Sequence, residues 1–144
     1  MARITVSTVL LAPPAQVWDE LSDIATHVVW MEDAVAIRFT SAMTSGVGTT
    51  FDCDTRVGPF SLTDHMEITA WEPGRRMGVR HVGMVTGVGE FRLKGLRRGR
   101  TKFTWTERLV FPWWMGGPPG SIVAAPVLKL IWRRNLRNLS TRFG

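Results

Sequence analysis

Residues 101–111, with the sequence TKFTWTERLVF, alternate between large apolar and polar side chains. One side of this stretch carries Phe103, Trp105, Leu109 and Phe111. A period of two predicts a β-strand with one buried face. That apolar side has one charged member, Glu107, and a carboxylate there is costly unless it is paired, protonated or hydrated. Glu107 is therefore the first candidate for a functional residue.

The same period of two recurs along most of the chain upstream. It predicts further strands over residues 3–11, 34–40, 49–57, 62–71, 76–83 and 87–96. In the second of these, Val35, Ile37 and Phe39 are expected to share the buried side. Alternating strands joined by short turns predict an antiparallel meander with one face covered.

Helical spacing appears in two places. Residues 12–23 and 24–31 predict two short helices after the first strand, because two prolines suit a helix entrance and apolar residues recur at helical spacing. Residues 121–143 predict a long amphipathic helix, in which Pro126 should bend or delay the start. Its apolar stripe consists of Leu128, Trp132, Leu136, Leu139 and Phe143.

Together these elements predict an α+β fold. A curved antiparallel sheet of about seven strands would wrap around the long C-terminal helix, since only that helix is long enough to cover the apolar face. The length of 144 residues suits one domain, and we expect a single domain over residues 1–144.

Composition excludes several classes of function. The formal net charge is +6, but its densest cluster, KGLRRGRTK at 94–102, has the pattern of a hairpin turn and lacks neighbouring stacking aromatics, so we expect no nucleic-acid partner. The single cysteine, Cys53, allows no intrachain disulfide and no cysteine zinc cage, and a cytoplasmic location is the simplest expectation. No apolar run is long enough to span a bilayer.

The motifs of cofactor chemistry are missing from the sequence. The glycine-containing stretch GVGTTF enters a strand rather than a helix, so it predicts a turn and no phosphate loop. His65 and Glu67 share a strand face, but it is the face expected toward solvent, and His27 is far away along the chain. We therefore expect no metal site and no cofactor.

Four stretches carry a resemblance to a known family: APPAQVWDELSDIATHVVWM (12–31), EITAWEPGRRM (67–77), GEFRLKGLRRGRTKFTWTER (89–108) and the C-terminal helix. In this order the chain resembles the START-related helix-grip superfamily, SRPBCC, and its bacterial polyketide cyclase/dehydrase-like branch, over essentially its whole length. The resemblance implies a hydrophobic cavity between sheet and helix in which members bind lipids, sterols, polyketides or hormones. Some members are cyclases or aromatases, and no catalytic motif is common to all.

A cavity in this position would be lined by the apolar side of each strand and by the long helix. The expected ligand-binding residues are Phe51, Cys53, Thr55, Met66, Ile68, Val79, His81, Phe91, Phe103, Trp105, Glu107, Leu128 and Asn135. A mostly apolar wall with a few convergent polar groups is typical of a small-molecule site.

Two functions remain open for this cavity. In the first, the protein binds a hydrophobic small molecule such as a lipid or polyketide, and a single polar anchor stands among apolar walls. In the second, it is a polyketide cyclase or dehydratase with Glu107, His81 and Asp64 as candidate acid/base residues, and two of them lie within hydrogen-bond reach. Each candidate also has a structural alternative: Glu107 pairs with an arginine, His81 is a core histidine, and Asp64 is exposed at a turn.

Residues 112–120, PWWMGGPPG, form a loop rich in chain-breaking residues. Trp113 and Trp114 would gate the cavity, make transient contact with a membrane surface, or fold back into the core. A weaker third hypothesis is a membrane or protein-interaction module that uses this loop. The sequence is compatible with a monomer or a homodimer.

Overall fold

The predicted sheet of seven antiparallel strands is confirmed by the computed structural model, which describes residues 2–112 and 117–144, with side chains over 2–112 and 124–144. The strands are β1 (Ala2–Leu10), β2 (Ala34–Phe39), β3 (Thr50–Val57), β4 (Phe60–Glu72), β5 (Arg76–Val82), β6 (Thr86–Leu96) and β7 (Arg100–Val110). Their order in the sheet is β1-β7-β6-β5-β4-β3-β2. Six strands thus form a meander, and β1 joins it by pairing antiparallel with β7.

The sheet is curved, and two β-bulges contribute to its bending. The pairing register shifts between Ala34 and Ala36 on β2, and between Ile68 and Ala70 on β4. A bulge adds a residue on one strand and increases the local twist. The bulge on β2 also changes which residues point inward, so the expectation that Val35 shares the buried side was wrong: its exposed fraction is 52%.

The predicted helices are present with shifted ends. They are α1 (Pro14–Leu21), η1 (Ile24–Thr26), α2 (His27–Trp30), α3 (Gly117–Ser140) and η4 (Thr141–Phe143). A further short 3-10 turn, η2 (Arg97–Gly99), lies in the predicted hairpin turn between β6 and β7. The long helix begins four residues before the predicted residue 121, because the prolines at 118 and 119 fall in the first turn, where a backbone N–H has no helical partner. Pro126 lies inside α3 and does not delay its start.

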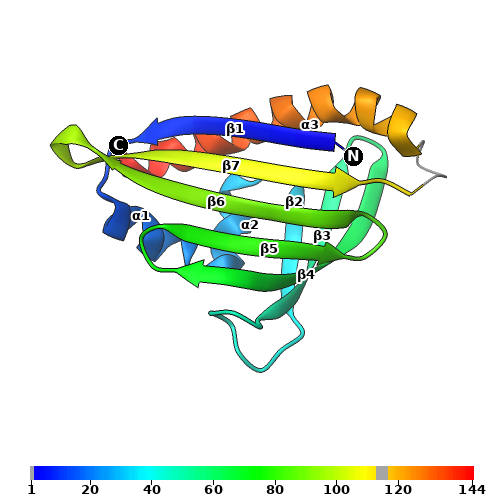
Figure 1. The fold of residues 1–144 in the computed structure, drawn as a ribbon, viewed down its shortest axis with the longest axis horizontal. Helices are drawn as coiled ribbons and strands as arrows, with labels where there is room; N and C mark the ends of the chain where they lie inside the picture. Colours follow the sequence, from blue (N-terminus) through cyan, green and yellow to red (C-terminus); the bar gives the residue numbers. More distant parts are fainter. Residues whose placement is uncertain (1, 113–116) are drawn as a thin grey trace.

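Figure 1 shows α3 running beside β1, with β2 and β3 turning behind the strands at the front. The apolar stripe of α3 faces the sheet, and its buried members include Trp132, Leu136 and Leu139. Trp132 stacks on Trp105 of β7, with ring centroids 4.6 Å apart. This arrangement is the helix-grip fold predicted from the order of elements.

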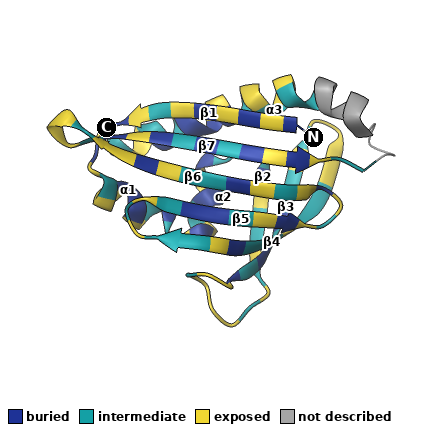
Figure 2. Ribbon diagram, viewed as in Figure 1, coloured by how far each residue is buried: buried dark blue, intermediate teal, exposed yellow. Residues whose placement is uncertain are grey.

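Buried residues alternate with more exposed ones along the strands, as the dark blue segments of Figure 2 show. Because side chains of a strand alternate between its two faces, this pattern means that one face of the sheet is buried. At one end of the sheet, α1 closes the inner space with its buried residues Val17, Trp18 and Leu21. The other end, at the β3–β4 and β5–β6 turns, leaves Phe60 and Met84 exposed. Over the described residues, the helices are all too short or too polar to cross a bilayer.

Candidate functional site

A cavity of about 620 Å³ lies between the inner face of the sheet, α2 and α3. Small-molecule sites commonly have volumes of ~300–1,000 Å³. Most of the wall consists of aliphatic, aromatic and methionine side chains from β2 to β7. It extends from His27 of α2 to Phe60 and Met84 at the end of the sheet that α1 leaves open.

The predicted lining residues lie on this wall, with two exceptions. Those on the wall are Phe51, Cys53, Thr55, Met66, Ile68, Val79, His81, Phe91, Trp105, Glu107 and Leu128, together with the catalytic candidate Asp64. They come from five strands and one helix, and the alternation of the strands turns them to one side. The structure also places Asp33, His27 and Trp132 there, which the strand alternation could not indicate because none of them is on a strand.

Phe103 and Asn135 do not line the cavity, contrary to the prediction. Phe103 is fully buried toward the closed end of the sheet, where its ring packs against Phe91 at 5.1 Å between centroids. Asn135 is fully buried against the segment before β2. Its Oδ1 accepts the backbone N–H of Glu32 at 2.9 Å, and its Nδ2 donates to Asp33 at 2.7 Å.

Trp113 and Trp114, the proposed gate residues, lie outside the described residues. Described residues on either side of 113–116 border the cavity: Phe111 lies before them in the chain, and Ala124 and Val127 lie after them.

A polar cluster on the cavity wall consists of His81, Glu107 and Asp64, and Trp105 donates to one of its carboxylates. Nε2–H of His81 donates to Oε2 of Glu107 at 2.7 Å, and Nε1–H of Trp105 donates to Oε1 of Glu107 at 3.2 Å. The carboxylate of Asp64 is 4.0 Å from Nδ1 of His81, which is too long for a direct hydrogen bond. His81 and Glu107 are both buried. Because Glu107 is hydrogen-bonded to His81, its partner is a histidine and not the arginine of the structural alternative.

Glu107 reaches His81 across an intervening strand. Glu107 is on β7 and His81 on β5, and Gly89 of β6 lies opposite Glu107 in the register. A Cβ atom at Gly89 would be 2.4 Å from the Glu107 carboxylate, so the carboxylate rests directly on the glycine backbone. Gly89 was not among the predicted site residues, although pairing GVGE with TWTER across the hairpin places it opposite Glu107.

The environment shifts the pKa values of two members of this cluster. Burial lowers the pKa of His81, but the hydrogen bond and charge of Glu107 and the charge of Asp64 outweigh burial, so the net shift is upward. Burial raises the pKa of Asp64, and the charges of Glu107 and Asp33 add to that effect. Both groups therefore keep a proton to a higher pH than usual, which favours His81 as a proton donor.

Two other wall residues, His27 and Cys53, have a structural role and are unsuited to catalysis. Nε2–H of His27 donates to the carbonyl of Leu21 at 2.8 Å, and burial lowers the pKa of His27, so it is a neutral core histidine. Burial raises the pKa of Cys53 to about 11, which makes it a poor nucleophile. Among the side chains that the structure describes, no group of three is placed to hold a metal ion.

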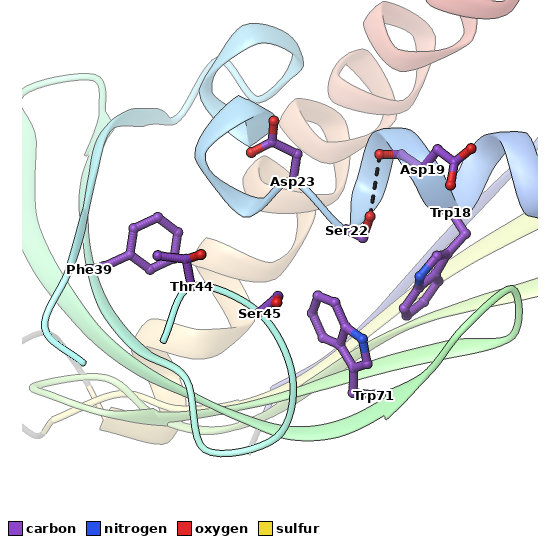
Figure 3. Close-up of a pocket in the computed structure, with 8 residues that line it drawn as sticks. All are labelled: Trp18, Asp19, Ser22, Asp23, Phe39, Thr44, Ser45 and Trp71. Carbon is purple, nitrogen blue, oxygen red and sulfur yellow. Dashed lines mark hydrogen bonds between the residues drawn. The ribbon is translucent and has the colours of Figure 1, made fainter. Parts of the chain in front are cut away.

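A second hollow, of about 590 Å³, is shallower and more open. Figure 3 shows it between Trp18 and Asp19 of α1, Asp23, Phe39 and the edge of Trp71. The two carboxylates do not converge on a common point in that view. The polar cluster of the first cavity has no counterpart here, and the first cavity is the candidate functional site.

The fold and the cavity together define a helix-grip protein of the START-related kind. The profile of the family described as polyketide cyclase/dehydrase and lipid transport matches residues 1–144. The chain therefore belongs to this family. Among curated proteins, none matches the chain in sequence.

Solved structures with the same fold have distant sequences. A START superfamily protein from Mycobacterium smegmatis is 10% identical, with a TM-score of 0.78 over 99% of this chain and 97% of that chain. The Zhui aromatase/cyclase from a Streptomyces species is 18% identical, with a TM-score of 0.74 over 97% of this chain and 92% of that chain. The protein XoxI from Bacillus cereus is 15% identical, with a TM-score of 0.78 over 99% and 96%. At these identities the likeness shows the fold alone.

Proposed function

We propose that this protein binds a hydrophobic small molecule of the lipid or polyketide kind in the cavity between sheet and α3. The observation that carries the proposal is a large, mostly apolar wall with a few polar side chains, among them the cluster of His81, Glu107 and Asp64. Burying apolar surface contributes about 25 cal/mol per Å² of surface removed from water. A ligand that fills the cavity therefore gains several kcal/mol from burial, before the costs of binding are subtracted. The family description, which names polyketide cyclases and lipid transport, supports this class of ligand.

Native mass spectrometry of the purified protein tests the proposal. We expect a co-purified adduct, or saturable binding of an added apolar probe such as methylpyrene. Val79→Phe adds volume to the cavity wall and should weaken binding, whereas Val88→Phe on the exposed side of β6 should not. Equal binding by both variants would place the ligand elsewhere on the molecule.

The His81–Glu107 hydrogen bond favours a second candidate function, acid/base catalysis on the bound molecule. An imidazolium at His81 can donate its Nδ1 proton to a ligand carbonyl oxygen, while ionised Asp64 accepts the proton from the adjacent carbon. The product is an enol. His81 has lost one proton and Asp64 has gained one, so the number of protons on the protein is unchanged. Enolisation of this kind begins both cyclisation and dehydration of polyketide-like substrates.

Deuterium exchange at the methyl group of acetylnaphthalene tests this second function. In heavy water we expect the protein to accelerate exchange above the buffer rate, as measured by NMR. His81→Gln and Asp64→Asn should remove the acceleration, while Glu67→Gln, on the same strand as Asp64 and paired with Arg80, should keep it. An exchange rate equal to that of buffer, with the probe bound, would leave the cavity a binding site without this chemistry.

A further inference from the structure

The charge of the cavity wall is opposite to that of the whole chain. The chain carries a formal net charge of +6, yet among the described residues no arginine or lysine lines the cavity. Residues 113–123, whose side chains are not described, contain no basic residue in the sequence. The acidic residues on the wall are Asp33, Asp64, Glu90 and Glu107, and Glu90 is paired with Arg76 and Arg92.

The other three carboxyl groups have few positive neighbours. Asp33 accepts hydrogen bonds from two neutral donors, Nδ2 of Asn135 and Nε1 of Trp132. Among the described wall residues near Asp64 and Glu107, only His81 can supply a positive charge. A ligand carboxylate or phosphate inside the cavity would therefore lose its hydration and face an excess of negative charge.

Two buried polar atoms of the cluster have no hydrogen-bond partner within the described part of the chain: Nδ1 of His81 and Oδ1 of Asp64. Both residues line the cavity, and Nδ1 of His81 lies 4.0 Å from the other carboxylate oxygen of Asp64. A ligand oxygen atom placed between Nδ1 of His81 and this carboxylate oxygen, which are 4.0 Å apart, can lie ~2.8 Å from each of them. A hydroxyl group both donates and accepts, an ammonium group only donates, and a carboxylate only accepts.

We propose that the cavity selects an uncharged, hydroxyl-bearing hydrophobic molecule, with its hydroxyl group between His81 and Asp64, and that it rejects ligands whose anionic group must enter the interior. The inference rests on the proposed binding function and names the chemical class of the ligand. The hydroxyl accepts from Nδ1–H of His81 and donates to ionised Asp64, or accepts from protonated Asp64 when it donates to neutral His81. The acidic wall keeps anions out.

Four fluorescent probes with one aromatic body test this selection: pyrenemethanol, methylpyrene, pyrenecarboxylate and pyrenemethylamine. Titration of the full chain with each probe gives four dissociation constants. We expect pyrenemethanol to bind about tenfold more tightly than methylpyrene, the value of one net hydrogen bond. Pyrenecarboxylate should bind no better than methylpyrene. Pyrenemethylamine should bind less tightly than pyrenemethanol despite the acidic wall, because its ammonium group loses hydration on entry and cannot accept a hydrogen bond from Nδ1–H of His81.

Asp64→Leu should remove the preference for pyrenemethanol and leave methylpyrene binding intact. Glu67→Gln, a change on the same strand outside the cavity wall, should keep the preference. Equal binding of pyrenemethanol and methylpyrene by the wild type, or tighter binding of pyrenecarboxylate or pyrenemethylamine, would overturn the inference while leaving the binding function standing. Failure of all four probes to bind would overturn both.

Discussion

At the scale of single residues, Glu107 keeps its hydrogen bond to His81 because Gly89 between them has no side chain. Gly89→Ala would place a Cβ atom 2.4 Å from the carboxylate. The carboxylate cannot move away cheaply, since it is buried and also accepts from Trp105. We expect Gly89→Ala to lower the free energy of unfolding by about 1–3 kcal/mol, the usual effect of overpacking a core.

Gly95→Ala, on the same strand, is the matched control for chemical denaturation. A Cβ atom there meets Pro14 at 3.5 Å, which is an ordinary contact. If both alanine variants were equally stable, the close approach of Glu107 to Gly89 would not constrain the site.

The charge of Glu107 sets the protonation of His81. Glu107→Gln keeps an oxygen that can accept from Nε2–H but removes the negative charge, so burial then dominates and the pKa of His81 should fall. An NMR titration of the His81 ring measures this change. Glu67→Gln should leave the titration of His81 unchanged, and an unaltered His81 pKa in Glu107→Gln would show that the pair is not coupled.

This pKa shift has a consequence for stability. A histidine with a raised folded-state pKa contributes stability that is fully present below its unfolded pKa, about 6.5, and is lost as pH rises through the folded pKa. The free energy of unfolding of the wild type should therefore decline over that window relative to the Glu107→Gln variant.

At the scale of elements, Asn135 holds α3 to the segment before β2. Asn135→Ala would leave the part-buried N–H of Glu32 without its partner and remove a donor from Asp33, which should cost on the order of 1–3 kcal/mol of unfolding free energy. Asn138→Ala, one turn later on α3, removes a longer 3.3 Å bond to the carbonyl of Trp30 and should cost less. Urea denaturation compares them; an equal loss would contradict a special role for Asn135.

The elements themselves were predictable because each has a local period. Alternation identified the strands, and the stripe of α3 identified its covering face. Features that depend on pairing between strands were not predictable from local pattern. The bulge on β2 reversed the expected side of Val35. On β7, Phe103 and Trp105 share the inner face, but Phe103 lies nearer the closed end of the sheet, so only Trp105 lines the cavity.

For the site, the sequence indicated Glu107, His81 and Asp64 because each is a polar residue in an apolar pattern. Their mutual distances depend on the register of β4, β5, β6 and β7, which no local signal specifies. Asn135 showed the same polar signal, but it serves the attachment of α3 and not the cavity.

At the scale of the whole molecule, Cys53 reports access to the cavity. With a pKa of about 11, roughly one thiol in a thousand is ionised at pH 8, so a disulfide reagent should react much more slowly than with a small free thiol. A bound ligand should slow the reaction further, since Cys53 lines the cavity, and denaturant should remove both effects. Rapid reaction in the folded protein, measured by thiol absorbance, would mean that Cys53 is accessible.

The pairing of β1 with β7 also governs how the chain folds as it is made. The hydrogen bond from Thr101 to the carbonyl of Ala12 joins residues 89 positions apart. At ~5–20 residues per second, the first strand waits roughly 4 to 18 s after leaving the ribosome tunnel before its partner strand follows. During that interval Ile4 and Val6, which the folded sheet buries, have no partner strand to cover them, and apolar side chains exposed in this way are prone to aggregation until β7 has been made.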